Sequence, residues 1–488
     1  MNTMHLQDLV KGRYGRRIAY TDAESITEEN VIRVVGECVG VFNWNKPVFK
    51  YLWDYKNGDQ PIRYRRKVVR DDVNNPIVEN HAWEIVRFKN GQTNGEPIQC
   101  VSSRKEDSVN KAIDLFNRYC SVAGKHEKDI SSGEWTSATG TGFKAVQRKK
   151  GDVPFRITVP TPINTFIIYS SHTGEPMLAV QELKDENGEY YKLCFSETHE
   201  YKIQNSKLIA YEDGKKSRLH VFGGIPIVEY PNNQDCVSDI ELVIDILDAI
   251  NNMQSNRMDA IEQFVQSWVK FINCNIDEDT FKKMKMMGAL VVKSNNGDNK
   301  ADVDIMSQEL NQTESQVAKD DLWNNALSIS AIPNKQSNTG GDTQGAVELR
   351  NGWDFSKQAA KLKDPYTVNA ERRLNKVIKN VLKQAQIKGV EFSDLDYDVQ
   401  ISHSPTDNMQ VKSQVFKMLV DAGIHPLIAI KTCGLWTDSE KIYLLSKPYL
   451  DVLYKTIDEV VVDAKEQERK AMELIENQNQ INNKATSE

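Results

Sequence analysis

The spacing of apolar residues changes several times along this chain, and each spacing predicts a different kind of element. From Val31 to about Tyr55 apolar residues recur at helical intervals. Short apolar runs separated by Gly, Asn and Asp turns follow up to about residue 230, and they predict strands. A helix from about Ser108 to Ala123 interrupts these strands. The predicted strands are Ile62–Val69, Phe155–Val159, Thr165–Tyr169, Leu178–Leu183, Tyr190–Phe195 and Ile225–Tyr230.

Long helices are predicted in the middle of the chain. Val237–Lys270 contains neither Gly nor Pro and predicts one helix roughly 50 Å long. A mixed segment, Phe271–Ser307, separates it from a second helix that ends at about Ile332. A third long helix begins at Ala346 and is expected to kink at Pro365.

The C-terminal quarter is predicted to be helical after one strand, Leu395–Ser402. One helical face ends at Gly423, a residue suited to a C-cap, and a second face follows it. The first face consists of Val411, Val415, Met418 and Leu419, and the second of Leu450, Leu453, Ile457, Val460 and Ala464. The last dozen residues are polar and predict disorder. The strand-rich first half and the helix-rich remainder together predict the fold class α+β.

Length and composition limit the kinds of protein this can be. A chain of 488 residues is long enough for two to four domains. It has no apolar stretch of membrane-spanning length and no apolar signal core at its start, which predicts a protein made and used in a cytoplasm without a membrane partner. Seven cysteines without a CxxC pair predict buried free thiols. The net charge of −7 argues against a broad basic surface that clamps DNA.

Two patterns could belong to enzymes. Gly140-Thr-Gly142-Phe-Lys-Ala145 matches a dinucleotide fingerprint, but polar residues precede it and a predicted strand follows it, which favours a turn. Asp394, Asp396 and Asp398 alternate with apolar residues, so on a strand they would share one face that could hold Mg²⁺. A strand with one wet face and one buried face is the favoured interpretation.

Other polar groups give weaker signals. The run Arg63-Tyr-Arg65-Arg66-Lys67, with Arg70, could bind phosphate, but adjacent aspartates favour a solvated strand end. His81 and His403 have no companion at metal-ligand spacing. The motifs GxxxxGK[ST], HExxH and GxSxG do not occur. We therefore predict no catalytic site, no metal and no cofactor.

The predicted helix Val237–Lys270 carries an unusual polar face. At 100° per residue, five acidic residues fall in one sector, and apolar residues occupy the opposite side. The acidic residues are Glu241, Asp245, Asp248, Asp259 and Glu262. The apolar residues are Val243, Leu247, Ile250, Ile261, Val265 and Trp268. A surface helix with acids toward water is one interpretation. A face that stays wet yet repels phosphate is the other, because a solvated face normally mixes both signs of charge.

Several separate strings, in order, resemble the portal proteins of siphophages that infect Gram-positive bacteria. The resemblance covers about residues 45 to 450. The strings are Tyr55–Arg65, Asn74–Val86 and Gly95–Gln99, then Ile227–Gln234 and Leu247–Asp259, then Ile332-Pro333 with Gly345-Ala346, and finally Lys412–Gln414 with Gly423–Pro426.

The resemblance implies a portal fold with a β-rich wing, long stem helices, a small α/β clip and a helical crown. Residues 1–230 and 346–404 would form the wing, 231–270 and 308–332 the two stem helices, and 271–307 the clip. Residues 333–345 would form a tunnel loop, and 405–488 the crown with a disordered tail. The five acidic residues above would line a DNA channel. The tunnel-loop residues nearest DNA would be Asn334, Lys335, Gln336, Ser337, Asn338, Thr339, Gly340, Gly341, Asp342 and Thr343.

The resemblance also implies partners and a place of action. The chain would form a dodecameric ring at one capsid vertex, through which double-stranded DNA passes during packaging and ejection. Its protein partners would be terminase, a head-completion or adaptor protein, scaffold and major capsid protein. It would act in the virion, and in the host cytoplasm during assembly. Two alternatives are a metal-dependent enzyme on nucleic acid and another phage head–tail structural protein.

Overall fold

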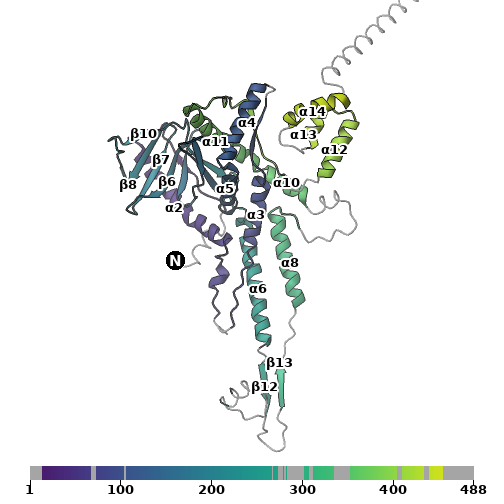
Figure 1. Ribbon diagram of the computed structural model, residues 1–488. Helices are drawn as coiled ribbons and strands as arrows, with labels where there is room; N and C mark the ends of the chain where they lie inside the picture. Colours follow the sequence, from purple (N-terminus) through teal and green to yellow (C-terminus); the bar gives the residue numbers. More distant parts are fainter. Residues whose placement is uncertain are drawn as a thin grey trace, which may run out of the picture. The chain divides into compact units, whose positions relative to one another are not determined.

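The computed structural model describes residues 14–67, 73–103, 106–265, 268–272, 279, 282, 302–306, 312–334, 352–403, 409–433 and 439–453 (Figure 1). The chain divides into two compact units. The first contains residues 1–94 and 119–388, and the second contains residues 95–118 and 389–488.

A seven-stranded sheet forms one part of the first unit, and helix α2 (Val31–Lys56) covers one of its faces. The strands run in the order β1-β5-β6-β7-β8-β10, with β9 paired to β8, and only β1 is parallel to its neighbour. Phe42 of α2 stacks on Phe166 with ring centroids 4.6 Å apart. Alternate residues of the central strands face opposite sides, so Ile168 packs toward α2 and Ile167 toward a second sheet. The strand bounds are β1 Ala19–Thr21, β5 Thr165–Ser170, β6 Pro176–Lys184, β7 Tyr190–Phe195, β8 His199–Gln204, β9 Lys207–Leu208 and β10 Ser217–Leu219.

The second sheet has three antiparallel strands in the order β11-β3-β4, and helices α5 and α11 pack beside it. The strands are Ile227–Pro231, Thr141–Arg148 and Phe155–Thr158, and the helices are Lys125–Thr139 and Asp364–Gln384. Gly140 ends α5 with a φ of 89°, and a Cβ there would lie 1.9 Å from the Cys236 carbonyl oxygen. The glycine-rich string therefore leads from a helix into a strand, as the turn interpretation predicted.

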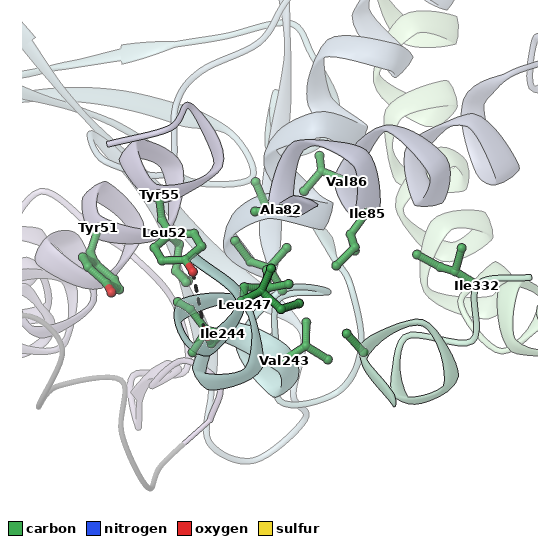
Figure 2. Packing of buried hydrophobic residues seen from close by; sticks show 14 of the residues in the cluster. Tyr51, Leu52, Tyr55, Ala82, Ile85, Val86, Val243, Ile244, Leu247 and Ile332 are labelled. Carbon is green, nitrogen blue, oxygen red and sulfur yellow. Dashed lines mark hydrogen bonds between the residues drawn. The ribbon is translucent and has the colours of Figure 1, made fainter. Parts of the chain in front are cut away.

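Two long helices, α6 (Ile244–Val265) and α8 (Gln312–Ile329), lie side by side and lead to an antiparallel pair of strands (Figure 1). These strands are β12 (Trp268–Ile272) and β13 (Asp302–Met306). At the other end, Leu247 and Ile250 pack with Leu52, Tyr55 and Ile85 in a shared core (Figure 2).

The predicted helix Val237–Lys270 is therefore too long at both ends. A 3-10 turn, η2 (Glu241–Val243), precedes α6. At the far end the aromatic and β-branched residues of Trp268–Ile272 form a strand, for which such residues are suited.

Other predictions also need correction. Ile62–Val69 is not a strand, because Pro61–Tyr64 forms a 3-10 helix, η1. The long helix expected to kink at Pro365 is instead two helices, α10 (Trp353–Lys361) and α11, with this proline in the first turn of α11. Helices α3 (His81–Asn94) and α5 were not predicted. The buried face of α5 carries Asp129, Ser132, Ser137 and Thr139, so apolar periodicity could not reveal it.

The second unit contains a two-stranded antiparallel sheet, β2 (Gln99–Ser102) with β14 (Tyr397–Gln400), and helices in its C-terminal part. The helices are α12 (Met409–Asp421), α13 (Pro426–Cys433) and α14 (Ser439–Leu453), and α4 (Asp107–Val122) begins in this unit. Gly423 has a φ of 84° and follows α12, as expected of a C-cap. The second predicted apolar face lies largely outside the described residues.

The three alternating aspartates do not share a strand face. Only Asp398 lies in β14. Asp396 is buried and accepts a hydrogen bond from the Ser393 amide at 2.6 Å in the preceding turn. The geometry that could hold Mg²⁺ on one strand face is therefore not present.

The state of the cysteines and the polarity of the helices can be compared with the predictions made from composition. Six cysteines are free and buried, as predicted, and Cys274 lies outside the described residues. Within the described residues, every helix is too short or too polar to span a membrane.

Candidate functional site: the base of α6 and its polar stripe

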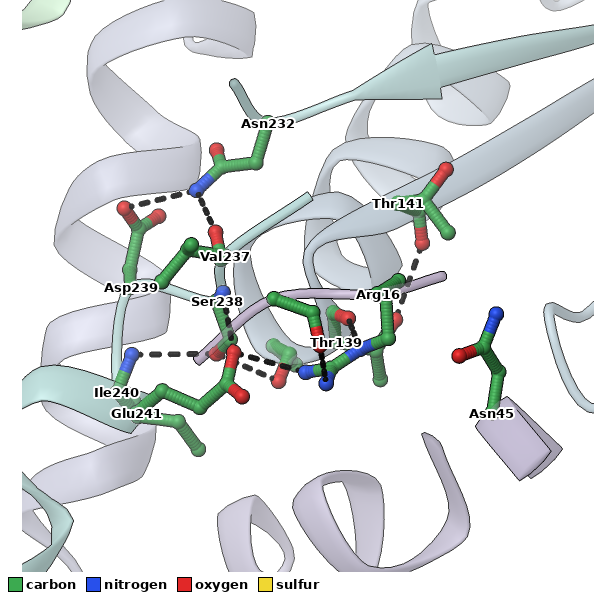
Figure 3. Close-up of polar contacts among 12 residues, drawn as sticks. Arg16, Asn45, Thr139, Thr141, Asn232, Val237, Ser238, Asp239, Ile240 and Glu241 are labelled. Carbon is green, nitrogen blue, oxygen red and sulfur yellow. Dashed lines mark hydrogen bonds and ion pairs between the residues drawn. The ribbon is translucent and has the colours of Figure 1, made fainter. Parts of the chain in front are cut away.

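The turn η2, which leads into α6, is held by local hydrogen bonds between side chains and backbone amides. The Ser238 amide donates to the Glu241 carboxylate at 2.7 Å, and the Ile240 amide donates to the Ser238 hydroxyl at 3.2 Å (Figure 3). Glu241 also pairs with Arg16 at 2.7 Å, and the two side chains are 0% and 4% exposed. The Arg16 Nε donates to the Thr139 carbonyl at 3.1 Å, so the N-terminal segment, α5 and α6 meet here.

Asp239, at the same turn, connects α6 to two further helices. Its carboxylate accepts hydrogen bonds from Ser137 of α5 at 2.6 Å and from Lys363 at 2.6 and 2.8 Å. Burial alone would raise the pKa of Asp239, but the charges of Lys363 and Lys89 hold it below its ordinary value. Burial lowers the pKa of Lys89 to about 8. Because Lys363 lies at the break between α10 and α11, Asp239 ties that break to the start of α6.

Farther along α6, three polar side chains form what we call the docking stripe: Asn251, Ser255 and Asp259. Each accepts a hydrogen bond from a backbone amide of the extended segment 75–79. Glu79 donates to Asn251 at 2.8 Å, Ile77 to Ser255 at 2.9 Å, and Asn75 to Asp259 at 2.7 Å. Four residues of helix advance about 6 Å and two residues of extended chain about 6.6 Å, so the two repeats stay in register.

Asp259 is also the ionic centre of this stripe. It pairs with Arg65 and Lys67, and its own side chain is 3% exposed. Burial would raise the pKa of Asp259, but the hydrogen bonds from Lys67 and Asn75 and the charge of Arg65 lower it. The basic run therefore supplies partners for a carboxylate, with Arg65 and Lys67 engaged by Asp259.

The five acidic residues predicted to share a channel face do not share one environment. Glu241 and Asp259 are buried in ion pairs, so the prediction that they present carboxylates to a channel is wrong for these two. Their partners come from residues 16, 65 and 67, which helical periodicity on one segment cannot reveal. Asp248 accepts a hydrogen bond from the Tyr55 hydroxyl at 2.9 Å, and Glu262 accepts one from the Asn75 amide group. Asp245 is exposed.

A different acidic surface emerges on the two long helices. Within the part of α6 and α8 whose side chains are described, every charged residue in the exposed class is acidic. These residues are Asp245, Glu314, Asp320 and Asp321. The two cations there are less exposed and engaged: Arg257 donates to Gln316 at 2.7 Å and Lys319 to Glu79 at 2.6 Å. Three of these acidic residues, Glu314, Asp320 and Asp321, lie on α8. The sequence signal for them was the excess of acidic over basic residues in 312–329, which the periodicity of α6 alone could not reveal.

The remaining candidates are distributed as follows. Asn334 donates to Asn324 at 2.8 Å, and the other tunnel-loop residues, 335–343, lie outside the described residues. His81 stacks on Trp323 with ring centroids 3.9 Å apart and lies between Glu79 and Glu84. The described residues contain no group of three or more His, Cys, Asp or Glu that could hold a metal ion.

Comparison with known proteins gives a family. No curated protein matches the chain. A chain in the virion of a native gene transfer agent (GTA) particle is 12% identical, with a TM-score of 0.45 over 82% of this chain and 93% of that chain. A chain in the neck of an empty GTA particle, computed with C6 symmetry, is 11% identical, with a TM-score of 0.46 over 80% and 94%. The family model described as "Phage portal protein, SPP1 Gp6-like" matches residues 43–441, most of the chain. The chain therefore belongs to the SPP1 Gp6-like family of phage portal proteins.

Proposed function

We propose that this portal protein assembles into a dodecameric ring at one capsid vertex, with α6 and α8 lining the channel for double-stranded DNA. The observation that supports this role is the charge of the two helices. Among their described side chains, the exposed charged residues are acidic, and the two cations are held in contacts within the subunit.

Such a wall favours sliding over binding. Repeated around a ring, Asp245, Asp320 and Asp321 would each give one circle of carboxylates. Within about 10 Å at 0.1 M salt, these carboxylates repel phosphate. A wall whose cations are already engaged also releases few counterions from DNA, so the duplex gains little by adhering to it.

The tunnel loop, residues 333–345, would contact DNA most closely. It carries one cation, Lys335, and one anion, Asp342, among neutral amides and hydroxyls. Gly340 and Gly341 allow backbone conformations that other residues avoid, so the proposed loop would be able to adjust as DNA moves. Deleting Ser337–Gly341 should leave rings intact but impair packaging or retention of DNA.

Other regions would serve assembly. Residues 271–307 would dock terminase during packaging and the head-completion or adaptor protein afterwards. Residues 1–230 and 346–404 would form the wing, and residues 405–488 would form the crown inside the capsid. Scaffold and major capsid protein would surround the ring during assembly in the host cytoplasm, before it becomes part of the virion.

The test has two parts, assembly and charge. Light scattering and electron microscopy of the full chain should show a ring, and a stable monomer at all concentrations would overturn the proposal. Changing Asp245, Asp320 and Asp321 to lysine should slow DNA packaging without preventing ring assembly. The control, with the same charge change, is lysine at three exposed acids in loops of the first unit, Asp152, Glu186 and Glu212. Equal packaging by both variants would show that α6 and α8 do not form the channel wall.

A further inference from the structure

The first unit contains a cavity of about 320 Å³ beside the described start of the chain. Residues 16–20 form one side of it, and α2, strand β5, the second sheet and α11 form the others. Its volume lies at the small end of the range for ligand pockets, about 300–1,000 Å³. Four aromatic side chains contribute to its walls: Phe42, Phe49, Phe143 and Phe166.

The carboxylate and the guanidinium groups inside this cavity already have partners within the subunit. Glu229 accepts hydrogen bonds from the Thr141 hydroxyl at 2.8 Å and from the Tyr169 hydroxyl at 2.6 Å. Arg16 and Arg373, which also line the cavity, are engaged in ion pairs. Because these groups are satisfied, an occupant of the cavity would be stabilised chiefly by the burial of apolar surface.

The mouth of the cavity carries large apolar side chains that are exposed. Ile18 and Tyr20 line the cavity, and Tyr14 lies a few residues earlier in the chain. Trp44 is exposed as well, and the Arg17 guanidinium stacks on its ring at 3.8 Å from the centroid, so this tryptophan lies beside the same segment. Exposed apolar residues that gather at one place indicate an interaction site.

We infer that the N-terminal segment of the same chain docks into this cavity with the side chains of Leu6, Leu9 and Val10. Residues 1–13 lie outside the described residues, and they directly precede the segment that lines the cavity. The three apolar residues recur at i, i+3 and i+4, which is the spacing of the anchors that a short helix inserts into an apolar groove. The docked segment would cover the cavity and the apolar side chains at its mouth.

The length of the segment allows this contact. Val10 is four residues before Tyr14 and Leu6 is eight, so their backbones reach at most about 14 Å and about 28 Å from it. Gly12 lies between the anchors and Tyr14 and permits the turn by which the segment folds back. A short tether also gives the segment an effective concentration of about a millimolar or more, which favours the same chain over a separate protein as the occupant.

A disulfide between the segment and the cavity tests the inference in the full-length protein. Asp8→Cys introduces a thiol next to the anchors, and Asn369→Cys introduces one at the exposed edge of the cavity on α11. The control pair combines Asp8→Cys with Asn43→Cys, at an exposed position of α2 that does not line the cavity. Under a mild oxidant, the test pair should give at least a fivefold higher yield of disulfide within one chain. A disulfide between position 8 and the native Cys236, which lines the cavity, supports the inference equally.

Two further changes, each added to the test pair, separate docking from mere proximity. Leu9→Ser with Val10→Ser removes two of the anchors and should lower the disulfide yield at least fivefold. Asn2→Ser with Gln7→Ser is the matched control, because it changes two polar residues of the same segment, and it should leave the yield unchanged. An unchanged melting temperature checks that each variant is folded.

Three outcomes would overturn the inference. Equal yields for the two cysteine pairs would show that the segment does not prefer the cavity. Equal yields for the Leu9 and Val10 variant and its polar control would show that the anchors do not hold it. A disulfide at the mass of two chains would assign the cavity to the segment of a second copy. The inference goes beyond the proposed channel, and none of these outcomes depends on ring assembly or DNA packaging.

Discussion

At the scale of single residues, the surroundings of a carboxylate decide what it does. Asp245 and Asp259 lie on the same helix, 14 positions apart, and the sequence pattern placed them on one face. Asp245 is exposed, whereas the Asp259 side chain is 3% exposed and pairs with Arg65 and Lys67. One of these residues can contribute to an acidic surface, and the other holds the structure together.

Asp259→Asn should destabilise the protein by about 1–3 kcal/mol, because two cations lose their anionic partner. The folded protein holds the pKa of Asp259 below its ordinary value, which is near 4. The ionised carboxylate therefore stabilises the fold fully at pH values above about 4. The stabilisation is lost as the pH falls through the lowered pKa. The difference in melting temperature between the two proteins should therefore be largest near neutral pH and shrink below about pH 4. Asp245→Asn is the control, and an equal effect there would show that the ion pairs contribute nothing.

At the scale of elements, the docking stripe shows how hydrogen bonds from backbone amides to side chains can hold an extended segment against a helix. Asn251, Ser255 and Asp259 accept hydrogen bonds from alternate amides of residues 75–79, which have no neighbouring strand among the described residues. Backbone amides buried without a partner are costly, so the stripe satisfies this segment and fixes its position along α6.

Asn251→Ala should release one end of this segment. The side chain of Asn251 is fully buried, accepts from the Glu79 amide and donates to Gln60. Leaving such groups unsatisfied costs about 1–3 kcal/mol, which corresponds to about five- to 150-fold faster hydrogen exchange at the Glu79 amide. Amides in β6 and β7 should be unaffected. Asn252→Ala, at the exposed neighbouring position, is the control. Unchanged exchange at Glu79 in the Asn251 variant would contradict the role of the stripe.

At the scale of the whole molecule, a buried cluster of four charges joins the second sheet of the first unit to both of its helices. Lys125 and Asp129 come from α5, Lys144 from β3 and Glu371 from α11, and each side chain is at most 7% exposed. Lys125 approaches Asp129 at 2.8 Å and Glu371 at 3.0 Å. The Tyr230 hydroxyl also donates to Glu371 at 3.0 Å. Two cations and two anions balance, so the removal of one leaves an uncompensated buried charge.

Glu371→Gln should cost about 3–5 kcal/mol in the free energy of unfolding, measured with urea at neutral pH. Burial would raise the pKa of Glu371, but Lys125 and Lys144 lower it to about 2. The stabilisation is therefore complete above about pH 4.5 and is lost only as the pH falls toward 2. Glu37→Gln removes an exposed partner of Arg33 and should change stability by less than about 1 kcal/mol. Equal effects of the two substitutions would show that the cluster is not important for stability.

The sequence by itself determined the elements that depend on local pattern. The helix at Val31, the helix near Ser108 and six of the seven predicted strands follow from apolar spacing and turn residues, and the structure confirms them. Ordered strings of residues also predicted the portal family, which the family model confirms over residues 43–441. Local spacing and residue order are properties of the chain itself, so they can be predicted before any folding is known.

Only the tertiary structure decided which polar residues face solvent. Helices α3 and α5 bury polar and charged side chains, so their apolar periodicity is weak. Glu241 and Asp259 fit a wet helix face by their spacing, yet their partners lie more than 190 residues away in the chain. The spacing of an acidic residue along a helix is the same whether its carboxylate is exposed to water or paired with a cation from a distant part of the chain. Its role is decided by the cation that folding brings to it, because burial is favourable only when the charge is paired.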